Sequence, residues 1–203
     1  MDANTLPLPL RELVERLAAL PGLGPKSALR IALTMLKWPR ERADALGQAV
    51  LDLREKLCFC RRCLSIAEQS PCPLCADPGR ERDQLCLVGE WDSLLALEAG
   101  GFYRGQYMVL GGLIAPLDGV DAASLDFAAL KARLAEGEVR ELILALGTTT
   151  EAEATASYVK NLLAREFPDI GLTRLAQGIP LGSEVKYVDR ETLRQSLLWR
   201  QKI

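Results

Sequence analysis

The fold of this chain is decided by the stretch Cys58-Phe-Cys-Arg-Arg-Cys-Leu-Ser-Ile-Ala-Glu-Gln-Ser-Pro-Cys-Pro-Leu-Cys75, which holds five of the six cysteines in the 203-residue sequence. It contains two Cys-x2-Cys pairs but no apolar periodicity, so it cannot build a core unaided. Four thiolates close a tetrahedron around Zn²⁺ at about 2.3 Å each, and the ion can replace that missing core. The spacing predicts one structural zinc ion, with no open coordination position, held by Cys60, Cys63, Cys72 and Cys75.

Two alternatives to a zinc site stay open for these thiols. Two disulfides are possible, although an intracellular chain of this size has little use for them, and an iron–sulfur cluster is also bound by four cysteines. Cys58 competes with Cys60 for the first ligand position, and Cys60 is preferred because it forms the Cys-x2-Cys pair. Cys86 falls inside a predicted strand and is best explained as a small buried apolar residue.

On the N-terminal side of this cluster, residues 1–57 are predicted to form a helical region. Apolar residues recur at the spacing of an amphipathic helix over residues 10–20, and Pro21-Gly22 ends that pattern. A second helix is expected from Pro25, which suits the first helical position, to about Lys37. A third is expected over residues 42–57, where the same spacing returns.

The turn between the first two helices is a candidate nucleic-acid site. It reads Leu20-Pro-Gly-Leu-Gly-Pro-Lys-Ser-Ala-Leu-Arg30, with Gly22 and Gly24 in the turn and Lys26 and Arg30 four residues apart on the helix that follows. Glycines let the backbone approach another surface closely, and a helix N-terminus with cations beside it fits a DNA phosphate. Such binding would be independent of base sequence and sensitive to salt. The alternative is a plain connection between two helices of a bundle.

On the C-terminal side, short apolar runs alternate with helical stretches, which is typical of a parallel α/β sheet. Strands are predicted at residues 86–88, 107–110, 142–146 and 172–176, and helices at 92–99, 125–134 and 151–167. The tail Glu184-Val-Lys-Tyr-Val188 is predicted to add a strand, and residues 190–200 a helix. The predicted organisation is a helical region at 1–57, a metal-binding finger at 58–83, an α/β domain at 84–178 and a C-terminal segment at 179–203.

The composition excludes several classes of function. The chain has no histidine, which removes histidine-based acid–base catalysis and every metal site that needs an imidazole. Its net charge is −2, so any attraction to nucleic acid has to be local. No apolar run approaches the roughly 18 residues that span a bilayer, and no secretion signal is recognisable at the N-terminus. We therefore expect a soluble, cytoplasmic protein without membrane contact.

The ordered set of motifs resembles the RecR family of bacterial recombination mediators. The helical turn and the four cysteines are followed by Tyr107-Met-Val-Leu-Gly-Gly-Leu-Ile-Ala-Pro-Leu-Asp-Gly-Val120, by Thr148-Thr-Thr-Glu-Ala-Glu-Ala-Thr-Ala156 and by residues 173–189. The resemblance implies a helix-hairpin-helix region, a zinc finger, a Toprim domain and a C-terminal assembly segment. It also implies that Lys26 and Arg30 contact DNA and that the four cysteines bind zinc.

The same resemblance implies partners and a mode of action. A homo-oligomer, a dimer or a tetrameric ring, would clamp single- or double-stranded DNA and, with RecO or RecF, help to load the recombinase RecA at single-stranded gaps. It would be associated with the nucleoid during repair. An acidic patch at the carboxyl ends of the strands suits a basic protein partner better than DNA; its expected members are Glu90, Asp92, Glu98, Glu151 and Glu153. The alternative for these carboxylates is a solvated first helical turn.

Two positions depart from the family pattern. The family usually has a glutamate directly after its short strand and an aspartate four residues later, where this chain has Gly89 and Ser93. It also has Ala152 where a glycine usually separates two glutamates. Without the usual Toprim acids, Mg²⁺ catalysis is unsupported, and we expect a non-catalytic protein. A Toprim-type nuclease or primase-like enzyme is one alternative, and a zinc-stabilised adaptor that never touches DNA is another.

Overall fold

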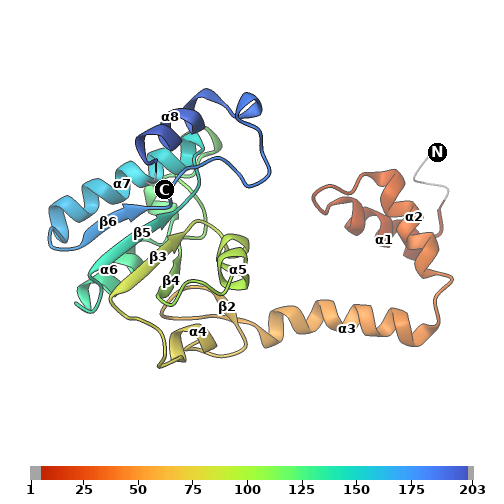
Figure 1. Cartoon of the computed structure of the whole chain (residues 1–203). Coiled ribbons are helices and arrows are strands. Elements are labelled where there is room, and N and C mark those ends of the chain that lie inside the picture. Colours follow the sequence, from red (N-terminus) through yellow and green to blue (C-terminus); the bar gives the residue numbers. More distant parts are fainter. Residues whose placement is uncertain (1–5, 201–203) are drawn as a thin grey trace. The chain divides into compact units, whose positions relative to one another are not determined.

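The computed structural model describes residues 6–200, and the chain divides into two compact units after Leu57. Figure 1 shows the helices and strands of both units along the chain. Within residues 6–200, no helix is both long enough and apolar enough to cross a membrane.

The first unit consists of the three predicted helices, α1 (Leu8–Ala18), α2 (Pro25–Met35) and α3 (Arg40–Lys56). Helices α1 and α2 pack together on either side of the turn. Ala28 and Ala32, four residues apart on one face of α2, are completely buried. Small side chains at these positions let the neighbouring helix backbone come close. Helix α3 has no fully buried residue.

The second unit is built on a four-stranded sheet of order β4-β3-β5-β6 in which every neighbouring pair is parallel. This confirms the predicted parallel α/β sheet. The strands are β3 (Gln84–Val88), β4 (Gln106–Val109), β5 (Glu141–Ala145) and β6 (Gly171–Arg174). The helices between them are α5 (Trp91–Ala99), α6 (Phe127–Ala135) and α7 (Thr150–Glu166).

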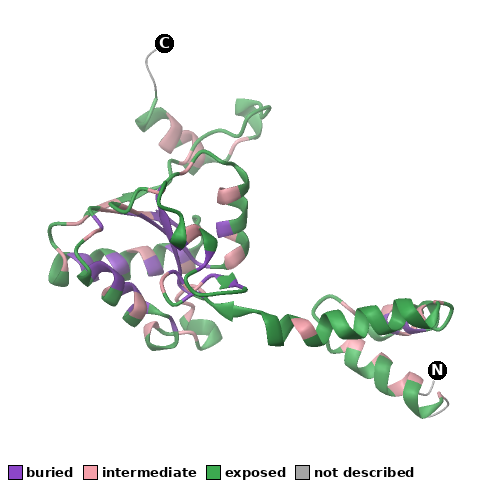
Figure 2. Cartoon of the chain, turned by 90° about the horizontal axis from the view of Figure 1, so that it is seen from below, coloured by how far each residue is buried: buried purple, intermediate pink, exposed green. Residues whose placement is uncertain are grey.

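The sheet is covered on both faces, which explains why its inner strand β3 is almost wholly apolar. Leu85 and Leu87 on β3 belong to an apolar cluster with side chains of α6 and α7. Cys86 and Val88, on the opposite face of the same strand, pack with Leu94 of α5. In Figure 2 the buried parts of the ribbon are concentrated in the strands and in segments of the helices beside them. Cys86 is 3% exposed, as expected for a small apolar core residue.

The remaining elements lie before the sheet, in the connection between β4 and β5, and after β6. A two-stranded antiparallel pair and a helix of one turn form the cysteine-rich segment: β1 (Cys58–Phe59), β2 (Ile66–Ala67) and α4 (Pro73–Ala76). Short 3-10 helices are η2 (Pro116–Asp118) and η3 (Ala122–Ser124), between β4 and α6, and η4 (Val185–Tyr187), after β6. Helix α8 (Arg190–Leu198) follows η4, within the range predicted for it.

The strand predicted at residues 184–188 is wrong, because this segment forms the 3-10 helix η4. The N–H of Tyr187 donates to the carbonyl of Glu184 at 3.0 Å, so the backbone satisfies itself locally. Val185 and Tyr187 are 62% and 77% exposed. A strand needs a neighbour to take its hydrogen bonds, and among residues 6–200 this segment pairs with none.

Candidate metal centre and nucleic-acid interface

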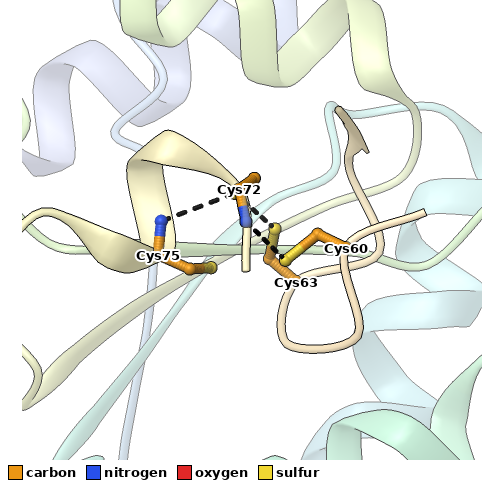
Figure 3. Close-up of side chains that lie close together, drawn as sticks. All are labelled: Cys60, Cys63, Cys72 and Cys75. Carbon is orange, nitrogen blue, oxygen red and sulfur yellow. Dashed lines mark hydrogen bonds between the residues drawn. The ribbon is translucent and has the colours of Figure 1, made fainter. Parts of the chain in front are cut away.

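The structure brings together the four cysteines of the two Cys-x2-Cys pairs (Figure 3). Their Sγ atoms all lie within 4.8 Å of one another, and the four residues are between 0% and 6% exposed. Cys60 and Cys63 come from the turn that follows β1, and Cys72 and Cys75 from the start of α4. Together with Ala67 they form the small core of this segment, so the thiols themselves occupy the place of an apolar interior.

The geometry of this cluster fits a tetrahedral metal ion. Four sulfurs at about 2.3 Å from a central Zn²⁺ lie roughly 3.8 Å from each other. The Sγ atoms of Cys63 and Cys72 are 3.5 Å apart, and all six cysteines of the chain are free thiols. The cluster can therefore hold one metal ion through four protein ligands.

Backbone N–H groups are aimed at the sulfurs, which stabilises negative charge on them. The N–H of Cys72 donates to Sγ of Cys60 at 3.3 Å, and the N–H of Cys75 donates to Sγ of Cys72 at 3.4 Å. A hydrogen bond from the Cys75 thiol, assisted by Ser65, lowers the pKa of Cys63. The same hydrogen bond raises the pKa of Cys75, because its thiol is the donor and keeps its proton, and burial away from water raises it further. A bound cation would stabilise the thiolate form of all four cysteines.

The position of Cys58 decides which cysteine starts the ligand set. Cys58 lies on β1 and is exposed, and it is not part of the buried group. Cys60 is completely buried inside that group. The geometry thus favours Cys60, as the Cys-x2-Cys spacing does.

Ion pairs attach the cysteine-rich turn to the rest of the second unit. Arg62, between the first two cysteines, pairs with Glu136 at 3.1 Å and with Glu138 at 2.9 Å. Arg133, whose side chain is 3% exposed, pairs with the same two carboxylates. The buried Arg133 guanidinium keeps Glu136 and Glu138 in place as its counter-charges, and the same two carboxylates hold Arg62 and its turn against the end of α6.

The hairpin between α1 and α2 has the geometry that exposes backbone donors. Gly22 has a φ of +76°, a left-handed conformation that favours glycine. Helix α2 begins directly after Gly24 with Pro25 in its first turn, and no side chain caps its N-terminus. The first N–H groups of α2 are thus left to water or to a ligand, as the sequence predicted.

The face of α2 opposite the buried alanines is basic. Lys26 and Arg30 are both exposed, and a third cation, Lys37, lies in the turn after α2. The three line one shallow hollow with Leu29, Leu33 and Thr34. No ion pair within residues 6–200 involves Lys26, Arg30 or Lys37. Lys37 is not among the DNA-binding residues predicted from the sequence, although its distance of eleven residues from Lys26 places both on one helix face.

Arginines neutralise two of the five carboxylates expected in the acidic patch. Glu98 lies in the last turn of α5, and its carboxylate pairs with the nearly buried guanidinium of Arg80. Glu153 forms two hydrogen bonds with the guanidinium of Arg174 on β6, at 2.6 and 3.3 Å. That pairing holds the pKa of Glu153 below its usual value. Two of the five carboxylates of the predicted acidic patch are therefore already paired with an arginine, which lowers the negative charge that the patch offers to a partner.

The other three carboxylates lie at the beginnings of two helices. Glu90 immediately precedes α5, Asp92 is in its first turn, and Glu151 is in the first turn of α7. Since β3 and β5 are parallel neighbours, both helix starts are at the same edge of the sheet. The carboxylate of Glu151 accepts hydrogen bonds from the backbone N–H of the same residue and from the hydroxyl of Thr149, which hold its pKa below the usual value. Among residues 6–200, the only group of three or more acidic or cysteine side chains close enough to share a metal is the cysteine cluster.

Gly89 and Ala152, two of the residues that depart from the family pattern, are both buried. Gly89 is buried, and a Cβ added there would come 3.1 Å from Cδ2 of Leu113, so a glutamate does not fit unless Leu113 moves. Ala152 is 1% exposed and packs in the larger apolar cluster, where a methyl group is accommodated. The nearby carboxylates of Glu90 and Asp92 thus stand beside the usual acidic positions without occupying them.

Comparison with known proteins covers nearly the whole chain. Residues 10–53 match the family model described as "RecR, helix-hairpin-helix", residues 83–176 match "Toprim domain", and residues 178–201 match "RecR, C-terminal". These matches confirm the predicted helix-hairpin-helix and Toprim regions.

Relatives that align with nearly the whole chain share one name. The chain is 65% identical to the "Recombination protein RecR" of Maridesulfovibrio salexigens, over 98% of this chain and 100% of that protein. It is 60% identical to the protein of that name from Nitratidesulfovibrio vulgaris, over 98% of each chain. It is 42% identical to that of Bifidobacterium adolescentis, over 96% of each.

Proposed function

The chain belongs to the RecR family of recombination proteins, and from this premise we propose that it is a DNA clamp without catalytic activity of its own. In this proposal it acts in recombinational repair in the cytoplasm, at the nucleoid, and helps RecO or RecF to load RecA at single-stranded gaps. The bound DNA is single- or double-stranded and is recognised without regard to base sequence.

The observation that carries the proposal is the basic face of α2 beside its uncapped N-terminus. Lys26 and Arg30 lie within the first two turns of a helix that offers its backbone N–H groups to an anion. A DNA phosphate can accept hydrogen bonds from those groups while the cations neutralise its charge. Lys37 extends the same face toward a further phosphate.

One such face binds weakly on a chain with a net charge of −2, so the clamp needs several copies. When copies of the hairpin face the same DNA, each further contact is intramolecular, and the overall affinity rises steeply. We propose a homo-oligomer, a dimer or a tetrameric ring, assembled in part through residues 179–203. Measuring the mass of the protein in solution with and without DNA tests this element of the proposal.

The cysteine cluster serves this function as a structural zinc site. Four thiolates with no open position suit a structural Zn²⁺, and such an ion supplies folding energy without chemistry. Cys60, Cys63, Cys72 and Cys75 would hold it.

A Toprim-type Mg²⁺ nuclease or primase-like enzyme is the second candidate, because the Toprim region matches by sequence. The experiment that separates the two uses the full-length protein on gapped DNA. A clamp binds the gap, accelerates RecA assembly in the presence of RecO, and leaves the DNA strands unchanged with Mg²⁺. Cleavage or primer synthesis that copurifies with the protein would refute the clamp proposal, and a lack of DNA binding would favour the adaptor.

The carboxylates at the strand ends give a prediction about the protein partner. We expect Glu151→Lys/Glu153→Lys to weaken association with RecO by about tenfold or more, because both charges of an acidic surface are reversed. Zinc content should be unchanged. Because Glu153 also pairs with Arg174, the single variant Glu151→Lys is the cleaner measurement, and Glu98→Gln, at a carboxylate already paired with Arg80, is the control. RecO affinity equal to that of the unmodified protein in both charge-reversal variants would remove these residues from the interface.

The two glycines of the hairpin give a matched pair of variants. Gly22→Ala should lower the free energy of unfolding by about 1 kcal/mol, because Gly22 has a φ of +76°. Gly24→Ala should leave stability nearly unchanged, since its backbone is extended and no atom lies within 4 Å of an added Cβ. If DNA approaches the hairpin closely, Gly24→Ala should still reduce DNA affinity several-fold. Thermal unfolding and DNA titration measure the two effects, and full DNA affinity in Gly24→Ala would contradict the close approach.

A further inference from the structure

Trp91 connects the cysteine-rich turn to the start of α5. Its indole Nε1–H donates to the backbone carbonyl of Leu64 at 3.0 Å. Its ring stacks on Phe59 of β1, with centroids 5.4 Å apart and planes inclined by 22°. One side chain thus contacts the cysteine-rich segment on both sides of the first Cys-x2-Cys pair.

The carbonyl that receives this hydrogen bond is positioned by the metal-binding turn. Leu64 directly follows Cys63 and has a φ of +60°, the only left-handed residue other than glycine within residues 6–200. Two backbone hydrogen bonds of 2.8 Å close the turn, from Leu64 to the carbonyl of Cys60 and from Cys60 to the carbonyl of Ser65. A leucine rarely adopts this conformation, so it persists where the surroundings determine it. A metal ion bound to Cys60 and Cys63 would fix the turn at both of these ligands.

At its other end Trp91 is the first residue of α5, between Glu90 and Asp92. These two carboxylates take part in no ion pair within the described part of the chain. The N–H and hydroxyl of Ser93 donate to Asp92, its neighbour in the sequence. Within residues 6–200, the Trp91 indole makes the only side-chain hydrogen bond from residues 90–92 to a distant part of the chain. Trp91 is thus the side chain that ties the acidic segment to the cysteine-rich turn.

We propose that Trp91 is a positioning residue that couples the metal-bound turn to the Glu90–Asp92 segment. With the metal in place, the carbonyl of Leu64 holds the indole, and Glu90 and Asp92 are presented at the edge of the sheet. When the metal leaves, the turn loosens and the segment loses its anchor. The use of this segment by a basic protein partner rests on the proposed function; the coupling itself does not.

A second connection between the turn and the sheet does not involve Trp91. The N–H of Val109 at the end of β4 donates to the carbonyl of Cys63 at 2.9 Å. This bond keeps the turn attached to the sheet when Trp91 is changed.

Because coupling between two sites is reciprocal, weakening the Trp91 contact must also weaken retention of the metal.

The first experiment compares Trp91→Phe with Trp38→Phe, a change in the other unit, in the full-length zinc-loaded protein. Phenylalanine keeps an aromatic ring for Phe59 but donates no hydrogen bond to Leu64. We expect Trp91→Phe to release zinc to a chromogenic chelator about three- to tenfold faster, since one hydrogen bond is lost. Amide hydrogen exchange over residues 90–95 should accelerate by a similar factor, with β5 unchanged. Wild-type rates of both zinc release and exchange in Trp91→Phe would overturn the proposal.

The second experiment uses Trp91 as its own reporter. The sequence has three tryptophans, so Trp38→Phe/Trp199→Phe leaves Trp91 as the only one. Removing the metal should shift its emission to longer wavelength, because the indole loses its carbonyl partner and its stacking on Phe59. Unchanged emission after verified loss of metal would refute the coupling. Neither readout uses RecO or DNA, so failure here would leave the proposed clamp function standing, and failure of partner binding in Glu151→Lys would leave the coupling standing.

Discussion

Cys63→Ser is expected to lose stoichiometric zinc and to lower the free energy of unfolding by about 4 kcal/mol or more. Cys63 is 1% exposed and lies in the buried group of four thiols, with its Sγ 3.5 Å from that of Cys72. A serine hydroxyl is a poor replacement for a thiolate, and the remaining three sulfurs keep little affinity for the ion. Metal analysis and chemical unfolding of the purified protein measure the two losses.

The size of this effect follows from what the segment lacks without a metal. The apparent binding free energy of a structural Zn²⁺ is about 10–16 kcal/mol in zinc-finger peptides near neutral pH, and this binding energy is folding energy. Besides the cysteines, the only buried residue of this small core is Ala67, which is 9% exposed. Apolar burial alone therefore cannot maintain residues 58–76 in their folded arrangement.

Cys58→Ser is the matched control, since it makes the same chemical change two residues before the first expected ligand. Cys58 is exposed and outside the group of four, so this variant should retain one zinc per chain and a stability within about 0.5 kcal/mol of the unmodified protein. The ligand assignment would be wrong if Cys63→Ser kept its zinc or if Cys58→Ser lost it. Iron in the purified protein, with visible absorption, would identify the iron–sulfur alternative instead.

The parts of the molecule that were predicted correctly are those with a local signal. The helices predicted from apolar spacing in residues 10–57, and the alternating strands and helices predicted after Leu85, are present in the structure. The Cys-x2-Cys spacing identified four residues that the fold does bring within 4.8 Å. Each of these signals is contained in a few neighbouring residues.

What could not be predicted depends on contacts between distant residues. Arg80 with Glu98 and Arg174 with Glu153 are separated by 18 and 21 residues, so their neutralisation of two acidic side chains is invisible in the sequence. The alternating polar and apolar residues at 184–188 resembled a strand, but strand formation depends on a neighbour that this segment does not have within residues 6–200. The link from Trp91 to Leu64 spans 27 residues and has no sequence signature.

The double charge reversal Lys26→Glu/Arg30→Glu is expected to reduce affinity for gapped DNA at low salt by about 100-fold or more. Both side chains are exposed on the face of α2 opposite the buried Ala28 and Ala32, so the reversals should leave the stability of the unit unchanged. Each copy of the chain in an oligomer carries the change, and the losses multiply across copies. Fluorescence anisotropy with labelled gapped DNA measures the affinity.

The salt dependence of binding distinguishes lost phosphate contacts from general repulsion. Lys26→Ala/Arg30→Ala should flatten the plot of log affinity against log salt by about 1.8 for duplex DNA, or about 1.4 for single strands, per hairpin engaged. The control Lys160→Glu/Arg165→Glu reverses two exposed charges on α7 of the other unit and changes the net charge by the same amount as the α2 reversals. Repulsion by net charge alone would weaken binding equally in the two double reversals, whereas a hairpin that grips phosphates makes the α2 variant far weaker. Equal losses in both double reversals would show that Lys26 and Arg30 have no direct contact with DNA. The clamp proposal would then be left without a DNA-binding surface.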